Sequence, residues 1–190
     1  MFGADELRRA LHLLGLTLEN RGLAAEIVVI GGGALLLHGW IARSTKDLDA
    51  LAVVQHGEYR SAHAMSPALR EAIDDTASVV GMDPMWLNAG PTAQLGYDLP
   101  AGFRERTTRL QFSGLIVHVA GRFDLICLKL YAAVDHDPRS KHVADLLDLA
   151  PDDGELADAA TWVKRQDGGA EFQAFVDQVV DHLKARRDAR

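Results

Sequence analysis

The chain has 190 residues, 48% of them hydrophobic and 25% charged, which is the composition of a globular protein with a substantial core. Its formal net charge of −7 argues against broad electrostatic capture of nucleic acid, although a local basic groove is compatible with it. The sequence has no long apolar run and no basic signal-peptide start, which argues against a membrane protein. Cys127 is the single cysteine, so an intrachain disulfide is excluded. From these observations we expect a cytoplasmic protein.

Hydrophobic periodicity predicts the elements of the first half of the chain. Leucines at 7, 11, 14 and 18 recur at helical spacing. The β-branched run at 27–30 is typical of a buried strand. We expect, in chain order, a helix over 5–20, a strand over 26–31, a helix over 33–41 and a strand over 47–54.

Three consecutive glycines follow the first predicted strand. Gly31, Gly32 and Gly33 allow a sharp turn and a close approach of a ligand to the backbone. The free N–H groups at the start of the next helix would then face an anion. A tight structural turn is the alternative, because the glycines fit neither the dinucleotide-binding fingerprint nor a P-loop.

Two carboxylates begin the second predicted strand. Asp47 and Asp49 are two positions apart, so both side chains share one face while Leu48 and Ala50 point into the core. Mg²⁺ is commonly held by one or two carboxylates together with substrate phosphates. Alone, the pair fits a solvated strand edge equally well. Combined with the glycine turn, it indicates metal-assisted chemistry on a nucleoside triphosphate.

The second half of the chain is predicted to be largely helical. A segment rich in glycine and proline at 81–102 predicts a long loop, and loops of that length are usually functional or mobile. Before this loop we expect a helix over 59–79 with a break at Ser66-Pro67. After it we expect a hairpin of 107–112 and 115–119 and helices over 123–134 and 142–149. Two terminal helices follow, and the last of them is amphipathic. We divide the chain into 1–121 and 122–190.

The order of these motifs resembles the DNA polymerase β-like nucleotidyltransferases. That superfamily carries a hydrophobic strand, a Gly-Gly pair and, after a gap, Asp-hydrophobic-Asp, as at Gly32-Gly33 and Asp47-Leu48-Asp49 here. The lead-in Arg43-Ser44-Thr45-Lys46 is more specifically similar to the bacterial AbiEii-type toxin nucleotidyltransferases and related small stand-alone proteins. Resemblance extends over about 25–150 and includes Trp86-Leu87-Asn88, the helix at 124–130 and the run at 139–146.

The resemblance implies a fold, a reaction and a set of partners. The fold would be α/β (α+β), a small mixed twisted sheet flanked by helices, with a helical C-terminal extension. The reaction would be Mg²⁺- or Mn²⁺-dependent transfer of a nucleotide from an NTP such as ATP to an RNA or protein acceptor. Some relatives are toxins that are paired with an antitoxin. The sequence indicates neither the acceptor nor an oligomeric state.

The resemblance also implies roles for particular residues. Asp47 and Asp49 would hold the metal, and the nucleotide would be bound by Gly31, Gly32, Gly33, Arg43, Ser44 and Thr45. Lys129 would lie near the triphosphate, whereas its apolar neighbours alone favour a lysine that reaches along the core surface to water. Asp47, Asp49, Lys129 and Asp145 are the residues predicted to be catalytic.

Some positions depart from the family pattern. Ala34 replaces a frequent serine, and His142 replaces an aspartate. The strand at 115–119 lacks the third carboxylate that many relatives use, and His118 or Asp145 could substitute for it.

Three alternatives belong to other functional classes. A catalytically degenerate nucleotide-binding module would explain the missing carboxylate. A protein-interaction module would dock through the amphipathic C-terminal helix. A glycosyltransferase also uses Asp-x-Asp with a metal-bound nucleotide, but normally needs a longer chain.

Overall fold

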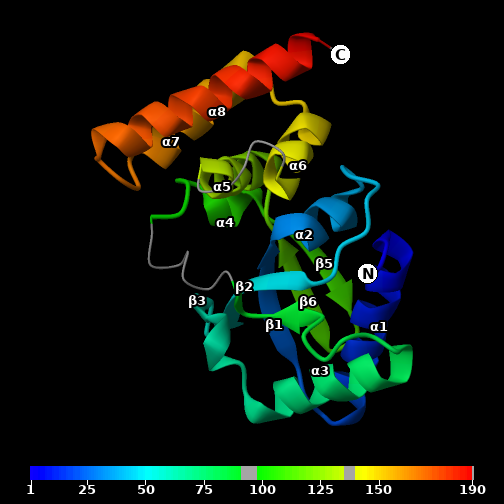
Figure 1. The fold of residues 1–190 in the computed structure, drawn as a ribbon. Helices are drawn as coiled ribbons and strands as arrows, with labels where there is room; N and C mark the ends of the chain where they lie inside the picture. The colour runs from blue at the N-terminus through cyan, green and yellow to red at the C-terminus, as the bar shows by residue number, and fades with distance from the viewer. Residues whose placement is uncertain (91–97, 135–139, 190) are drawn as a thin grey trace. The chain divides into compact units, whose positions relative to one another are not determined.

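A computed structural model describes residues 1–90, 98–134 and 140–189 (Figure 1). One unit comprises Met1–Leu99 and Arg104–Ala120, and the other comprises Pro100–Phe103 and Gly121–Arg190. The middle of the predicted loop, at 91–97, and Arg139 of the late motif lie outside the described residues.

The first unit is built on a mixed sheet of six strands in the order β3-β2-β1-β6-β5, with β4 paired to β2. The central strand β1 pairs antiparallel with β2 and parallel with β6. Its residues from Ile27 to Ile30 are buried, as expected for a β-branched run with neighbours on both sides. The strands are β1 (Ala25–Ile30), β2 (Leu48–Gln55), β3 (Glu58–Ser61), β4 (Leu87–Asn88), β5 (Thr108–Phe112) and β6 (Leu115–Val119).

Three longer helices of this unit pack on the sheet or on one another. Helix α1 (Ala4–Asn20) contacts α3 (Pro67–Val80) and the hairpin of β5 and β6, and α2 (Gly31–His38) contacts β1 and β2. Gly15 lets α1 approach the hairpin, since a Cβ there would overlap the carbonyl of Phe112. A short helix, α4 (Phe103–Arg106), precedes β5.

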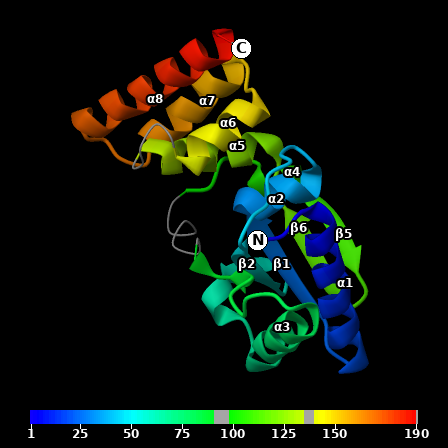
Figure 2. The ribbon, with the colours of Figure 1, turned by 45° about the vertical axis from the view of Figure 1, so that its right-hand side comes forward.

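The second unit is helical. Helix α5 (Arg122–Val134) contacts α6 (Lys141–Leu149), α7 (Asp153–Lys164) and α8 (Ala170–Asp188), and α7 and α8 run side by side (Figure 2). Arg122 donates two hydrogen bonds to the Glu155 carboxylate, at 2.8 and 3.0 Å, and these bonds lower the pKa of Glu155. In the apolar stripe of α8, Val176, Val180 and Leu183 are buried inside this unit, whereas Phe175 is 44% exposed. The docking face postulated for a protein-interaction module is therefore covered only in part.

The predicted fold class is confirmed: a twisted mixed sheet is flanked by helices, and the C-terminal part is helical. Among the described residues, no helix combines the length and the apolar character needed to cross a membrane.

The helix predicted over 59–79 is wrong in its first part. Residues Glu58–Ser61 form β3, which pairs antiparallel with β2, and a 3-10 turn follows at Ala62–Ala64. Helix α3 starts only at Pro67, where the Ser66 hydroxyl accepts a hydrogen bond from the Leu69 N–H. Ser66-Pro67 is therefore a helix start rather than a break within a helix, which is the position where serine and proline are both favourable.

Candidate active site

The glycine turn lies at the junction of β1 and α2. The helix begins at Gly31 and ends at His38, so the glycines form its first turn instead of a loop preceding a helix over 33–41. Gly31 has a φ of +75°, a conformation that glycine adopts without the steric cost of a side chain. A Cβ on Gly31 would overlap the carboxylate of Asp49 and lie 3.1 Å from its Cγ.

The Asp49 carboxylate is placed by the pairing of β2 with β1. Asp49 is in register with Ile30, the last residue of β1, which brings its side chain to the start of α2. Asp47 lies directly before β2. Leu48 and Ala50 are fully buried while Asp47 and Asp49 are partly exposed, and this alternation is the one expected for two carboxylates on one face.

The segment leading to Asp47 lies against the second glycine. A Cβ on Gly32 would be 3.3 Å from the Thr45 hydroxyl oxygen and 3.4 Å from Nη2 of Arg43. Thr45 is buried, and its hydroxyl donates a hydrogen bond of 3.2 Å to the carbonyl of Asp47. Ser44 is exposed instead, and its hydroxyl is 3.9 Å from Sδ of Met1. The structure thus brings Thr45 and Arg43 to the glycine turn, and directs Ser44 elsewhere.

Thr45 is held by a residue that the sequence analysis missed. The Phe2 N–H donates to the Thr45 carbonyl at 2.8 Å, and the Thr45 N–H donates to the Phe2 carbonyl at 3.0 Å. The Phe2 side chain is buried. The signal available in the sequence was an aromatic residue in a charged N-terminal stretch. Such a residue is expected to be buried, but the sequence does not identify the residue that it contacts.

Gly33 has a packing role. A Cβ on Gly33 would be 2.5 Å from Cδ1 and 3.2 Å from Cα of Leu48, so the absence of a side chain lets α2 approach the backbone of β2. A larger residue there would separate the helix from the strand that carries Asp49.

Asn88 is a second residue that the site predictions omitted. Strand β4 pairs parallel with β2, and Asn88 is in register with Asp49. Residues in register on neighbouring strands point to the same face, so Asn88 and Asp49 are neighbours there. Its side-chain oxygen accepts a hydrogen bond from the Gly90 N–H at 2.7 Å. The Trp86-Leu87-Asn88 string was noted as a family resemblance, and it was the signal for this residue.

Lys129 and Asp145 are brought together in the second unit. Nζ of Lys129, on α5, is 2.6 Å from Oδ2 of Asp145, on α6, and both side chains are buried. The interpretation of Lys129 as a lysine that reaches water is therefore wrong, because the ammonium has a buried carboxylate as its partner.

His38, at the end of α2, packs between backbone and ring partners. Its Nε2 is 3.0 Å from the Ala120 carbonyl, and its ring stacks on Trp40 with centroids 3.9 Å apart. Burial lowers the pKa of His38; the hydrogen bond to Ala120 opposes this shift, and the charge of Arg8 adds to it. The neutral ring is therefore favoured, with the Nε2 proton donated to the carbonyl.

The donors available for a metal at this turn are carboxylate oxygens. The part of the chain that the structure describes contains no group of three or more His, Cys, Asp or Glu side chains suited to hold a metal ion. Asp47 and Asp49 fit Mg²⁺ in the way in which it is usually bound, with few protein carboxylates and the remaining positions taken by phosphates and water. The side-chain-free backbone at Gly31 leaves the Asp49 carboxylate directly beside the helix start.

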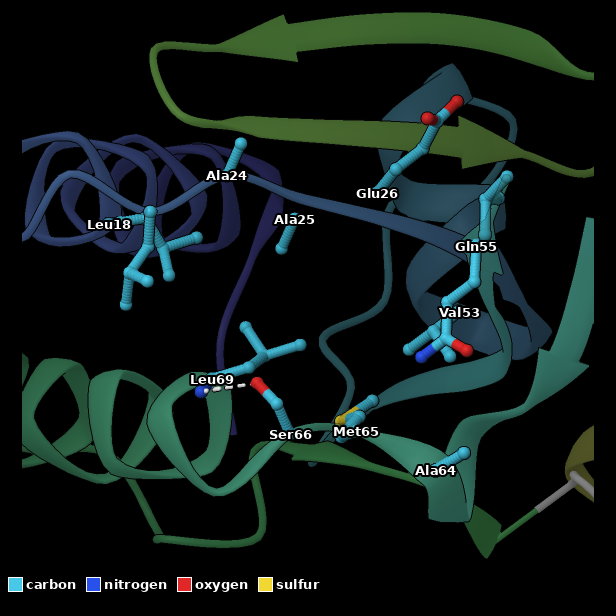
Figure 3. A pocket seen from close by; sticks show the side chains of 12 residues that line it. Leu18, Ala24, Ala25, Glu26, Val53, Gln55, Ala64, Met65, Ser66 and Leu69 are labelled. Atoms are coloured by element: carbon cyan, nitrogen blue, oxygen red, sulfur yellow. Dashed lines mark hydrogen bonds between the residues drawn. The ribbon is translucent and has the colours of Figure 1, made fainter. Parts of the chain in front are cut away.

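Two hollows in the first unit lie away from the glycine turn. One, of about 120 Å³, is lined by Leu18, Glu26, Val53 and Met65 among others, at the end of β1 and β2 opposite to the glycine turn (Figure 3). The other, of about 390 Å³, lies between α1, the end of α3 and Lys46. Lys46 directly precedes Asp47, so this second hollow adjoins the carboxylate segment.

Comparison with known proteins yields a family match. A family model described as a nucleotidyltransferase of unknown function (DUF6036) matches residues 6–151, which include the glycine turn, the carboxylates, Lys129 and Asp145. No curated protein and no solved structure matches the chain. The predicted resemblance is confirmed at the level of a nucleotidyltransferase, and the closer similarity to AbiEii-type proteins stays a prediction.

Proposed function

The chain belongs to the DUF6036 family of nucleotidyltransferases of unknown function, and from this we propose that it transfers a nucleoside monophosphate from an NTP to an RNA or protein acceptor in a Mg²⁺-dependent reaction. One observation carries the proposal. The Asp49 carboxylate lies against Gly31, at the first turn of a helix whose next glycine faces Arg43 and Thr45. The groups that we propose to bind the metal and the phosphates would therefore meet at one point.

The helix start would bind the phosphates. The first N–H groups of a helix have no partner within it. In α2 the partly exposed Gly31 carries no side chain of its own, whereas Gly32 is buried against Thr45 and Arg43. Arg43, close to Gly32, adds a positive charge whose planar guanidinium suits phosphate oxygens. Thr45 keeps this segment in place through its bonds to Phe2 and Asp47.

Asp47 and Asp49 would hold Mg²⁺ or Mn²⁺. The bound ion would supply Lewis-acid stabilisation of the charge that develops on the phosphate oxygens during transfer. The chain's own contribution is orientation, because β1–β2 pairing fixes Asp49 and the Thr45 hydroxyl fixes the backbone at Asp47.

Lys129 and Asp145 enter the proposal as a pair. Since the ammonium already neutralises Asp145, we assign the two residues to positioning α5 against α6 rather than treating Lys129 as a lone ligand of pyrophosphate. Asp145 is correspondingly unsuited to serve as an independent third carboxylate.

The acceptor and the biological role rest on the resemblance alone. Similarity of the Arg43–Asp49 string to AbiEii-type toxins supports an RNA or protein acceptor, and supports the role of a toxin that an antitoxin restrains. The alternative is a nucleotide-binding module without turnover.

The test is a transfer assay with each NTP labelled at its α-phosphate, in the presence of Mg²⁺, total RNA and a protein extract. We expect label in RNA or protein with the wild-type chain, and none with the double variant Asp47→Asn/Asp49→Asn. The control is Asp74→Asn, which removes an exposed carboxylate from α3. Absence of labelling with every NTP would reject the transferase, and NTP binding without labelling would establish the nucleotide-binding module.

A further inference from the structure

Asn88 stands beside the Asp49 carboxylate on the neighbouring strand. In the parallel pairing of β4 with β2, Leu87 is in register with Leu48, and Asn88 is in register with Asp49. Burial follows this register, because both leucines are buried while Asn88 and Asp49 are partly exposed. Paired strands lie about 4.8 Å apart, so the two polar side chains are adjacent on one face of the sheet.

Strand β4 has only two residues, and the residue before it holds it in place. The Leu48 N–H donates to the Trp86 carbonyl at 2.6 Å, and the Trp86 side chain is fully buried. The indole N–H of Trp86 donates to the Ile73 carbonyl on α3 at 3.3 Å. Asn88 therefore directly follows an anchored segment, and the sheet carries its side chain to Asp49.

One hydrogen bond orients the Asn88 amide. Its Oδ1 accepts from the Gly90 N–H at 2.7 Å, and in an amide side chain only the oxygen can accept from an N–H group. The Nδ2 group carries two donors, and it has no hydrogen-bond partner among the residues that the structure describes. The side chain thus offers donors to a ligand, whereas a metal ligand has to offer a lone pair.

Donors at this position suit an anion. Asp49 lies against Gly31 in the first turn of α2, where the proposed function places the phosphates. A phosphate oxygen close to a carboxylate is repelled by it, and a hydrogen bond from an adjacent donor offsets part of that repulsion. The Asn88 amide is uncharged, so it supplies this bond without competing with Mg²⁺ for the carboxylates.

We propose that Nδ2 of Asn88 donates a hydrogen bond to a phosphate oxygen of the bound NTP, and that Asn88 is not a ligand of the metal. The inference rests on the proposed function, to which it adds a residue that binds the triphosphate. Because the contact is to phosphate, it acts on every NTP irrespective of the base, both with and without Mg²⁺.

The experiment is calorimetry of inorganic tripolyphosphate and of ATP, each with EDTA and with Mg²⁺. We expect Asn88→Ala to weaken the binding of both ligands by about tenfold, as for the loss of a hydrogen bond to a charged group. The melting temperature should stay unchanged, since Gly90 is exposed and water can accept from its N–H. Asn20→Ala is the matched control, because Asn20 is the only other asparagine in the sequence and lies exposed at the end of α1.

The variant Asn88→Asp separates a phosphate donor from a metal ligand. Its carboxylate still accepts from the Gly90 N–H but has no donor, so we expect weaker ATP binding with EDTA and with Mg²⁺. A third metal ligand would have the opposite effect, because a carboxylate there would make Mg²⁺ strengthen ATP binding more than in the wild type. Asn20→Asp adds the same charge away from the site and serves as the control.

Three results would overturn the inference: tripolyphosphate binding by Asn88→Ala as tight as by the wild type, a loss confined to ATP, which would place the contact at the sugar or base, or tighter Mg²⁺–ATP binding by Asn88→Asp. Failure of the proposed function looks different. A wild-type chain that shows no Mg²⁺-coupled NTP binding refutes both. Coupling that needs Asp47 but is indifferent to Asn88 refutes only the role of Asn88.

Discussion

Gly31 is subject to two independent constraints. Its φ of +75° disfavours any side chain, and a Cβ would also overlap the Asp49 carboxylate. Gly39, at the other end of α2, has nearly the same φ of +74°, but its missing Cβ faces open space. The two glycines therefore separate the cost of backbone strain from the cost of displacing the carboxylate.

We predict that Gly39→Ala lowers the free energy of unfolding by about 1–2 kcal/mol, the cost of a side chain in the left-handed region, and that Gly31→Ala lowers it by at least as much because its Cβ also displaces the Asp49 carboxylate. Only Gly31→Ala is expected to abolish the effect of Mg²⁺ on NTP affinity, because the alanine pushes Asp49 away. Chemical denaturation and calorimetry measure the two quantities. Equal NTP–Mg²⁺ coupling in the two variants would show that Asp49 does not need its position beside Gly31.

The buried pair of Lys129 and Asp145 changes what a substitution at Lys129 does. Replacing the lysine leaves the Asp145 carboxylate buried without its counter-charge, whereas replacing both residues with apolar ones leaves no buried charge there. A stability effect is therefore expected before any catalytic effect.

We predict that Lys129→Met lowers the free energy of unfolding by about 3–5 kcal/mol, and that Lys129→Met/Asp145→Leu recovers most of this loss. Urea denaturation of the wild type, the single variants and the double variant completes the cycle. A single variant as stable as the wild type would mean that the ion pair contributes little to the second unit.

At the scale of elements, α2 starts at the glycine turn of the candidate site and ends at His38, whose pKa is shifted. Burial favours neutral His38 in the folded chain, so its pKa lies below the ordinary value of 6.5. Between 6.5 and that lower pKa, the unfolded chain binds a proton that the folded chain does not. The contribution of His38 to stability is complete above pH 6.5 and is lost as the pH falls through the folded pKa.

We therefore predict that His38→Gln, which can still donate to the Ala120 carbonyl, makes the melting temperature depend less on pH below 6.5 than it does in the wild type. His12→Gln on α1 is the control, because that side chain is exposed. Thermal unfolding followed by circular dichroism across this range gives the comparison. The same change of melting temperature with pH in His38→Gln and in the wild type would contradict a lowered pKa of His38.

Elements with a strong local signal were predictable. The leucine spacing of α1, the β-branched run of β1 and the alternation of the β5–β6 hairpin each fix the type of element. Strand β3 was not predictable, because Glu58–Ser61 has no alternation of apolar and polar residues. This segment forms a strand because it pairs with the edge of β2. Tertiary pairing overrides local propensity in such a segment.

At the scale of the whole chain, the sequence predicts which residue types belong to a site better than it predicts their partners. The glycines and the two aspartates are close in sequence, and the structure brings Gly31 to Asp49. The contact of Thr45 with Phe2 joins residues far apart in the chain, and no local pattern encodes it. Lys129 and Asp145 are about as close in sequence as Gly31 and Asp49, but they lie on two different helices and no local pattern pairs them. Gly33 illustrates the same limit, because only its closeness to Leu48 assigns it to packing.

The central claim is that Asp47 and Asp49 form a metal site that acts on a nucleotide bound at the glycine turn. Isothermal titration calorimetry of NTP binding, with and without Mg²⁺, tests it most directly in the wild type and in Asp47→Asn. We predict that Mg²⁺ strengthens NTP binding to the wild type, and that Asp47→Asn removes this strengthening without lowering the melting temperature, because Asp47 lies partly exposed outside the core. The same Mg²⁺-dependent gain in affinity in both proteins would contradict the claim.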